Sequence, residues 1–149
     1  MADETTMSDQ PETKPDWGIP TSAPAVNLDS QRFWEATAEG RLLLQRCDSC
    51  GTVVWWPRVL CPECQSFDLS WFEATGKGRV YSHTVVHRAP GGWGRSTPYV
   101  LAYVELDEGP RLMTNIVDCD PEAVAVDAPV RVVWHDTGEG NALPRFTLV

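Results

Sequence analysis

The sequence has few basic side chains and none of the signals that direct a chain into or across a membrane. Among 149 residues, 12 are Lys or Arg, only two of them lysines, and 21 are Asp or Glu, so the formal net charge is −9. Such a charge repels nucleic acids and anionic membrane surfaces. No apolar run approaches the ~20 residues of a membrane span, and the acidic N-terminus lacks the apolar stretch of a secretory signal. We therefore expect a cytoplasmic protein that binds neither nucleic acid nor membrane.

The sequence also lacks the short motifs of common enzyme classes. It contains no H-E-x-x-H, no G-x-S-x-G, no P-loop and no dinucleotide-binding G-x-G-x-x-G, each of which would place catalytic or phosphate-binding groups together. His83 and His87 share a face if one extended strand carries both, and His135 falls in another predicted strand. No nucleophile pattern accompanies them, so we expect a chain that is not catalytic on its own.

The first 46 residues predict an arm followed by a helix. Residues 1–27 are acidic and interrupted by four prolines, which predicts a disordered arm. Trp17 and Ile19 are the arm's side chains best suited to dock on a folded domain. Residues 28–46 predict a helix, with polar caps before it and a glycine after it, and then a short strand.

Four of the five cysteines form two C-x-x-C pairs, Cys47 with Cys50 and Cys61 with Cys64, separated by ten residues. Thiolates are soft ligands, and two such pairs suit tetrahedral Zn²⁺. Because four protein ligands leave no open position, the metal is expected to be structural. Residues 47–75 therefore predict a zinc ribbon with a zinc cofactor.

Other roles for the cysteines stay open from spacing alone. An iron site of rubredoxin type uses similar turns, and a single redox C-x-x-C pair is the other alternative. Structural disulfides are disfavoured in the cytosol. The fifth cysteine, Cys119, lies beside several acidic residues in "VDCDPE". Their charges raise a thiol pKa and reduce its reactivity, which predicts a spare thiol.

From residue 76 onward the hydrophobic pattern changes to a period of two, which is typical of strands. Val100, Ala102, Val104 and Leu106 are expected on one buried face. "DPEAVAVDAP" predicts a short helical turn before the fourth strand. Residues 76–149 therefore predict a five-stranded Greek-key barrel of the OB type, in a fold that is mainly β. The strands are expected at 78–88, 98–106, 111–118, 130–136 and 145–149.

Two sets of side chains are candidates for binding. The loop between the first two barrel strands contains Trp93 among glycines, flanked by Arg88 and Arg95. This loop suits an anchor for a ligand or partner, or else Trp93 simply caps the barrel. Trp34, Trp55 and Trp56 add more aromatic surface than a domain of this size readily buries, so we expect the helix and ribbon to form a partner interface.

The order of motifs resembles one known family. "FWEATAEGRLLLQRC", "WWPR" before "CPEC", "GKGRVYSHTVVHR", "PYVLAYVELDEGPRLMTNIVDCDPEAV" and "PVRVVW" are similar to the OB-fold, acyl-CoA-associated proteins with a rubredoxin-like zinc ribbon. That family was long catalogued as a domain of unknown function. The resemblance covers residues 29–149. One departure is Asp127, which stands where many members have a glycine.

The resemblance implies a role in acyl-CoA chemistry. Members typically accompany thiolases, hydroxymethylglutaryl-CoA synthases, or thiolase-like aldolases that cleave the side chains of steroid-CoA thioesters. It thus implies a hetero-oligomer in which this chain is the non-catalytic partner subunit, supporting assembly and acyl-CoA binding. In that role Arg88 and Arg95 would pair with CoA phosphates and Trp93 would cover the adenine or the acyl chain.

Two other functions remain as alternatives. A nucleic-acid-binding ribbon and OB-fold protein would stack bases on Tyr81, Tyr99 and Tyr103, although the net charge opposes this. The second alternative is an enzyme in its own right, such as a CoA-thioester hydrolase.

Overall fold

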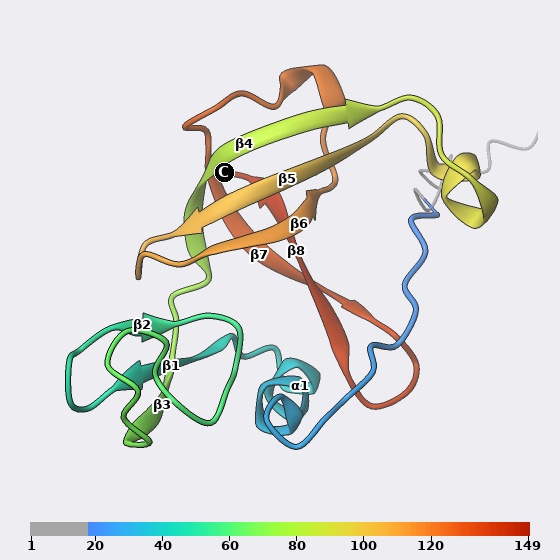
Figure 1. The fold of residues 1–149 in the computed structure, drawn as a ribbon. Coiled ribbons are helices and arrows are strands. Elements are labelled where there is room, and N and C mark those ends of the chain that lie inside the picture. The colour runs from blue at the N-terminus through green and yellow to red at the C-terminus, as the bar shows by residue number, and fades with distance from the viewer. Residues whose placement is uncertain (1–17) are drawn as a thin grey trace, which may run out of the picture.

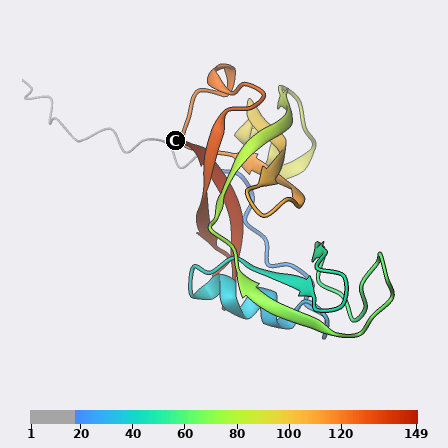
Figure 2. The same ribbon diagram turned by 90° about the vertical axis from the view of Figure 1, so that its left-hand side faces the viewer.

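The computed structural model describes residues 18–149, as a small open sheet and one helix packed against a closed barrel (Figure 1). Residues 1–17 of the predicted arm, Trp17 among them, lie outside the described residues. No helix between residue 18 and the last residue, Val149, is long and apolar enough to cross a membrane. The helix and open sheet occupy one end of the barrel, and β3 leads directly into β4 (Figure 2).

Helix α1 (Gln31–Ala38) begins after the N-cap residue Ser30. Its buried side chains are Phe33, Trp34, Ala36 and Thr37, and the rest of its surface is exposed. The Thr37 hydroxyl donates to the Trp34 carbonyl at 2.6 Å and accepts the backbone N–H of Ala142 at 3.0 Å. This hydroxyl therefore fastens the helix to the last barrel strand.

The open sheet has the order β2-β1-β3 and is antiparallel, formed by β1 (Leu43–Cys47), β2 (Val53–Val54) and β3 (Leu69–Glu73). The strand at β1 was predicted, whereas β3 was not, since apolar and polar residues do not strictly alternate along "LSWFE". Gln45 ties the loop between the cysteine pairs to β1: its amide donates to the Arg58 carbonyl and accepts the Arg58 N–H.

The barrel confirms the predicted OB-type fold. Its strands are β4 (Lys77–Val86), β5 (Tyr99–Leu106), β6 (Arg111–Ile116), β7 (Pro129–Asp136) and β8 (Ala142–Leu148). They close in the order β4-β5-β6-β8-β7. β6 and β8 pair in parallel, and every other pairing is antiparallel. The predicted inward face of β5 is buried as expected, together with Val80, Val130 and Phe146.

Three details of the barrel differ from the sequence-based expectation. β4 ends at Val86, so His87 lies beyond the strand and does not share a strand face with His83. A bulge between Val80 and Ser82 also shifts the alternation, because one extra residue is left without a partner. β8 begins at Ala142, three residues before the predicted start.

The segments between the strands contain two short 3-10 helices. Gly91–Ser96 lies between β4 and β5, and Pro121–Ala123 matches the predicted turn before β7. Asp127 has a φ of 67°, the left-handed conformation that glycine adopts most readily. Its N–H donates to the Val80 carbonyl at 2.8 Å, so this turn is formed with aspartate in place.

Candidate functional site

The four paired cysteines meet at one point of the ribbon. The Sγ atoms of Cys47, Cys50, Cys61 and Cys64 all lie within 4.8 Å of one another. Cys47 and Cys64 are 3.5 Å apart at sulfur, and Cys50 and Cys61 are 3.6 Å apart. A tetrahedral zinc with ~2.3 Å bonds holds its sulfurs about 3.8 Å apart. The donor set and spacing therefore fit a structural zinc.

Two similar turns bring the sulfurs together. The N–H of Gly51 donates to the Cys47 carbonyl at 2.8 Å, and that of Gln65 donates to the Cys61 carbonyl at 2.9 Å. Both Gly51 and Gln65 have a positive φ, of 78° and 62°. Each pair thus reverses direction four residues after its first cysteine, which turns both sulfurs toward the same centre.

The thiols of this cluster cannot all ionise easily without a cation. Hydrogen bonds from the side chain and backbone of Thr52 lower the pKa of Cys50 to about 6. At Cys64 a backbone hydrogen bond from Ser66 lowers the pKa, but the contact with Cys47, burial and the remaining thiols outweigh it and raise it to about 12. A bound Zn²⁺ supplies the positive charge that lets all four become thiolates.

A cluster of four aromatic rings lies where the helix meets the ribbon. Phe33 contacts Trp34, Trp55 and Trp56 edge to face, with ring centroids 5.0, 5.4 and 5.3 Å apart. Trp55 and Trp56 are half-buried, but Trp34 is only 8% exposed. The expectation that Trp34 is a surface residue is therefore wrong, because this helix face packs onto the ribbon loop and the barrel.

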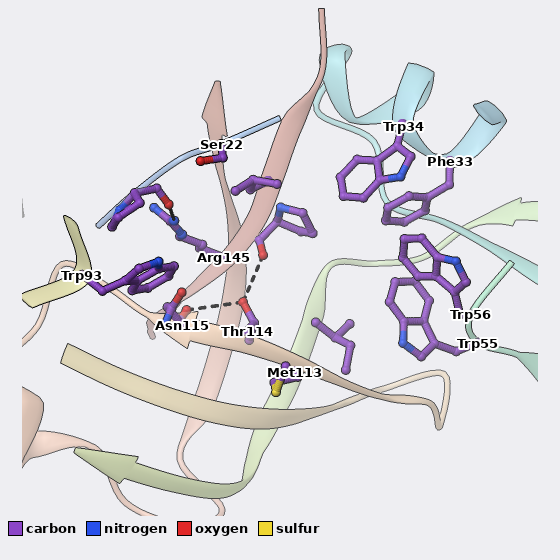
Figure 3. A pocket seen from close by; sticks show the side chains of 14 residues that line it. Ser22, Phe33, Trp34, Trp55, Trp56, Trp93, Met113, Thr114, Asn115 and Arg145 are labelled. Carbon is purple, nitrogen blue, oxygen red and sulfur yellow. Dashed lines mark hydrogen bonds between the residues drawn. The ribbon is translucent and has the colours of Figure 1, made fainter. Parts of the chain in front are cut away.

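These rings form one wall of a pocket of about 370 Å³ between the ribbon and the barrel. Trp93 lies across the pocket from them, and Met113, Thr114 and Asn115 of β6 line the space between (Figure 3). Two groups of residues that the sequence singled out separately, the helix and ribbon tryptophans and Trp93, thus line the same pocket.

The remaining loop residues have different positions. Trp93 lies on the 3-10 helix Gly91–Ser96 and packs against Tyr99 at 5.2 Å. Arg88 and Arg95 are exposed and do not line the pocket. A Cβ at Gly94 would lie 2.6 Å from the Ala89 carbonyl oxygen. Only glycine therefore lets the backbone at residue 94 pass so close to the backbone at residue 89 within this loop.

Arg145 organises the polar end of the pocket, although nothing in the sequence singles it out. Its side chain on β8 is 3% exposed. Nη2 donates to the Pro20 carbonyl at 2.7 Å, and Nη1 to the Thr21 hydroxyl at 3.2 Å and the Ile19 carbonyl at 3.5 Å. Nη1 also lies 2.6 Å from Nδ1 of His135. Nothing in the sequence indicates that an arginine in this predicted strand is buried.

Arg145 thereby holds residues 18–22, here named the N-terminal strap, against the barrel. The Ser96 hydroxyl adds a hydrogen bond to the Gly18 carbonyl at 2.5 Å. Residues 18–27 belong to the predicted disordered arm, and the structure differs there: they run along the barrel from the 3-10 helix to α1 (Figure 1). Ile19 is half-buried, in line with its expected ability to dock.

Cys119 lies apart from the cysteine cluster and is half-buried. Burial, and then the charges of Asp118 and Asp120, raise the pKa of its thiol. The predicted direction of this effect is confirmed, with burial as its larger cause.

Two family profiles match the chain. The rubredoxin-like zinc ribbon domain of ChsH2 matches residues 34–70, and the C-terminal OB-fold domain of ChsH2 matches residues 71–135. Among solved structures, a chain of the Ltp2-ChsH2(DUF35) aldolase is 40% identical with a TM-score of 0.76, and the alignment covers 85% of this chain and 98% of that one.

The curated relatives include DUF35 scaffold proteins and subunits of enzymes that act on CoA thioesters. A DUF35 domain-containing scaffold protein of Methanocaldococcus jannaschii is 40% identical over 106 residues, which cover 70% of this chain and 75% of the relative. A probable enoyl-CoA hydratase alpha subunit of Thermomonospora curvata is 42% identical over 83% of this chain. The matched region spans only 38% of that hydratase subunit's length.

Proposed function

Because the chain belongs to the ChsH2 (DUF35) family of zinc-ribbon and OB-fold proteins, we propose that it is the non-catalytic partner subunit of a thiolase-like enzyme. The enzyme is of the thiolase or steroid side-chain aldolase type and acts on acyl-CoA in the cytoplasm. The observation that carries this proposal is the 40% identity to the DUF35 chain of an aldolase over 98% of that chain. A benzoylsuccinyl-CoA thiolase subunit of Geobacter metallireducens, 31% identical, supports it.

In this function the zinc site is a scaffold. Cys47, Cys50, Cys61 and Cys64 hold one zinc with no position left for water or substrate. The metal supplies folding energy to the ribbon, and the ribbon's loop carries Trp55 and Trp56. The site thereby presents two aromatic side chains beside the barrel in a fixed orientation.

The helix and ribbon are the proposed side for the large subunit, with Trp34, Trp55 and Trp56 at its centre. Trp34 acts from within, by packing the cluster, since it is buried. The ribbon also exposes apolar side chains next to its cysteines: Val59 is 57% and Phe67 71% exposed. Apolar side chains that water would otherwise surround are typical of the core of an interface.

The loop with Trp93 is the proposed contact for the CoA thioester. Arg88 and Arg95 are exposed on either side of Trp93, and no hydrogen bond or ion pair within residues 18–149 uses their guanidinium groups. Guanidinium groups bind phosphates with two parallel hydrogen bonds. In the proposed arrangement they hold the CoA phosphates outside the pocket while Trp93 covers the part of the ligand that enters it.

The test is to isolate the large subunit and to measure acyl-CoA cleavage or condensation by each subunit alone and by both together. The tagged full chain is used to purify its partner from the native host, and the partner is then produced separately. We expect no activity from this chain alone and a large gain when it is added to the partner. Equal activity of the partner with and without this chain would rule out the proposed function.

The loop is tested within the assembled complex. The double variant Arg88→Ala and Arg95→Ala is expected to raise the KM for acyl-CoA while the subunits still assemble, because both side chains are exposed and support no described contact. Unchanged KM and kcat would show that the loop is only a connection between β4 and β5.

A further inference from the structure

The pocket between ribbon and barrel has two chemically different sides. One wall is the aromatic cluster of Phe33, Trp34, Trp55 and Trp56, whose rings hold one another edge to face. The facing residues of β6 supply the polar side chains Thr114 and Asn115 (Figure 3). Pockets of ~300–1,000 Å³ at the junction of two structural units are the common places for small ligands, and this one has about 370 Å³.

The polar side chains of β6 are already satisfied by the protein. The Thr114 hydroxyl donates to the Pro144 carbonyl at 3.0 Å, and the Asn115 amide donates to the Val100 carbonyl at 2.9 Å. Both residues are only 7% exposed. A ligand group therefore gains little by bonding to these donors, and the aromatic wall favours the burial of an apolar group.

The shape of the aromatic wall favours rings over flexible chains. Side chains that pack edge to face offer both ring faces and ring edges to a neighbour, and such contacts add to the energy of burial. The wall is also rigid, since Phe33 is completely buried and Trp34 nearly so. A flat, rigid ligand loses less conformational entropy there than a flexible chain would.

The N-terminal strap forms part of the same pocket. Pro20 and Ser22 line it, as do Pro144 and Arg145 of β8. Pro20 also faces the loop of Trp93, since a Cβ added at Gly92 would lie 3.6 Å from Pro20 Cγ. These strap and β8 residues lie outside residues 34–135, the region that the two family profiles match. The two matched domains alone therefore leave this pocket incomplete.

We propose that this pocket binds a neutral, flat, apolar ring system and that the N-terminal strap is part of the binding site. Met113 stands at its opening, 62% exposed on the outer face of β6. The identification of the ring system with the acyl group of a thioester rests on the proposed function. The binding itself needs no partner, so it is measured on the full isolated chain.

The probe is 1-pyrenemethanol, which is neutral, flat and able to accept energy from tryptophan. With zinc-loaded protein we expect saturable quenching of tryptophan emission, with one probe per chain. 1-Decanol, a neutral chain, is expected to displace it at least tenfold more weakly than 2-naphthalenemethanol does. Quenching that does not saturate, or equal displacement by chain and ring, would overturn the proposal.

Two charged variants locate the binding. Met113→Lys is expected to weaken pyrenemethanol binding at least tenfold, because it brings a charge to the apolar opening without disturbing a buried contact. Val126→Lys is the matched control, since Val126 is 57% exposed and lines none of the described pockets. Equal affinity of the Met113 variant and its control would place the probe elsewhere and refute the pocket.

The strap is tested in the same way. Pro20→Asp puts a carboxylate on the pocket wall and is expected to weaken binding at least tenfold, whereas Leu28→Asp, at a residue that is 90% exposed, is expected to leave it unchanged. Circular dichroism and zinc content identify a variant that has lost its fold. Wild-type affinity in a folded Pro20 variant would exclude the strap from the site. If the chain assembles with and activates its partner yet binds no ring probe, the proposed function stands and this inference fails.

Discussion

The ribbon and the barrel are both folded units, but different interactions stabilise them. The barrel shares a core with the helix and β1 that includes Phe33, Leu44, Val80 and Phe146. The ribbon has a separate cluster of Cys47, Val54 and Cys61, with Leu69 packed against it. Two of the three buried residues of this cluster are metal ligands, so the stability of the ribbon depends on the ion, whereas that of the barrel depends on apolar burial.

The largest expected effect comes from removing a zinc ligand, because the ribbon depends on the metal and the barrel does not. Cys61→Ser removes a completely buried ligand, and structural zinc sites contribute an apparent ~10–16 kcal/mol that is coupled to folding. We expect metal-depleted protein with an unfolded ribbon, measured as zinc per chain and by proteolysis between residues 47 and 75. Cys119→Ser is the matched control and should retain one zinc. A metal-free wild-type chain with an intact ribbon would show that the ribbon does not depend on zinc for its stability.

A core variant of the barrel should show the reverse pattern. Phe146→Ala empties a completely buried position on β8, and such a change costs about 3–5 kcal/mol from lost burial and the cavity that remains. The denaturation midpoint should fall while zinc per chain stays at one in the folded protein. Met113→Ala, at an exposed position of the same barrel, should leave the midpoint nearly unchanged. Loss of zinc before loss of the barrel would show that the two regions depend on one another.

A smaller effect is expected at the seam between two barrel strands. A Cβ at Gly78 would lie 2.4 Å from the backbone oxygen of Glu105 on β5, so Gly78→Ala must push the two strands apart. Overpacking of this kind costs about 1–3 kcal/mol. Gly92→Ala is the control, because its added carbon makes only an ordinary contact with Pro20 at 3.6 Å. Equal stability of the two variants in urea would show that the strands adjust freely.

The same contrast explains what the sequence could predict. Ribbon and barrel each repeat a local pattern: paired cysteines bind one ion, and alternating residues of β5 face one core, as Val100 and Val104 do. The pocket has no such pattern, because its walls come from segments far apart in the chain. Arg145 meets Pro20 across 125 residues, and Ser96 meets Gly18 across 78. Strand β3 was missed for a related reason, since its pairing with β1 determines it more than its own residues do.

The burial of Trp34 and Arg145 shows a second limit of the sequence. Composition suggested that the tryptophans are too many to bury, yet Trp34 is buried and packs against the rings of Phe33 and Trp56. Arg145 is buried because backbone carbonyls of a segment outside the barrel satisfy its guanidinium group. Neither arrangement follows from the periodicity of one element, since each depends on which segments the fold brings together.

The smallest expected effect concerns one backbone angle of the barrel, at Asp127. Its φ of 67° costs most residues about 1–2 kcal/mol, and aspartate somewhat less. Both of its described hydrogen bonds are made by backbone atoms: its N–H donates to Val80, and its carbonyl accepts from Arg79 at 3.0 Å. Asp127→Gly keeps them and relieves the angle, but a glycine adds about 0.4–1 kcal/mol of unfolded-state entropy. We therefore expect a net change between zero and about 1 kcal/mol of added stability.

Asp127→Ala is the variant that isolates the cost of the left-handed φ for a residue with a Cβ at this position. Alanine loses the aspartate side chain as glycine does but retains a Cβ, so it should be less stable than Asp127→Gly by about 1 kcal/mol in urea unfolding. Zinc content should be the same in both variants, since the turn lies in the barrel and the ribbon has its own source of stability. If glycine and alanine give the same unfolding midpoint, the left-handed angle at residue 127 does not limit the stability of the barrel.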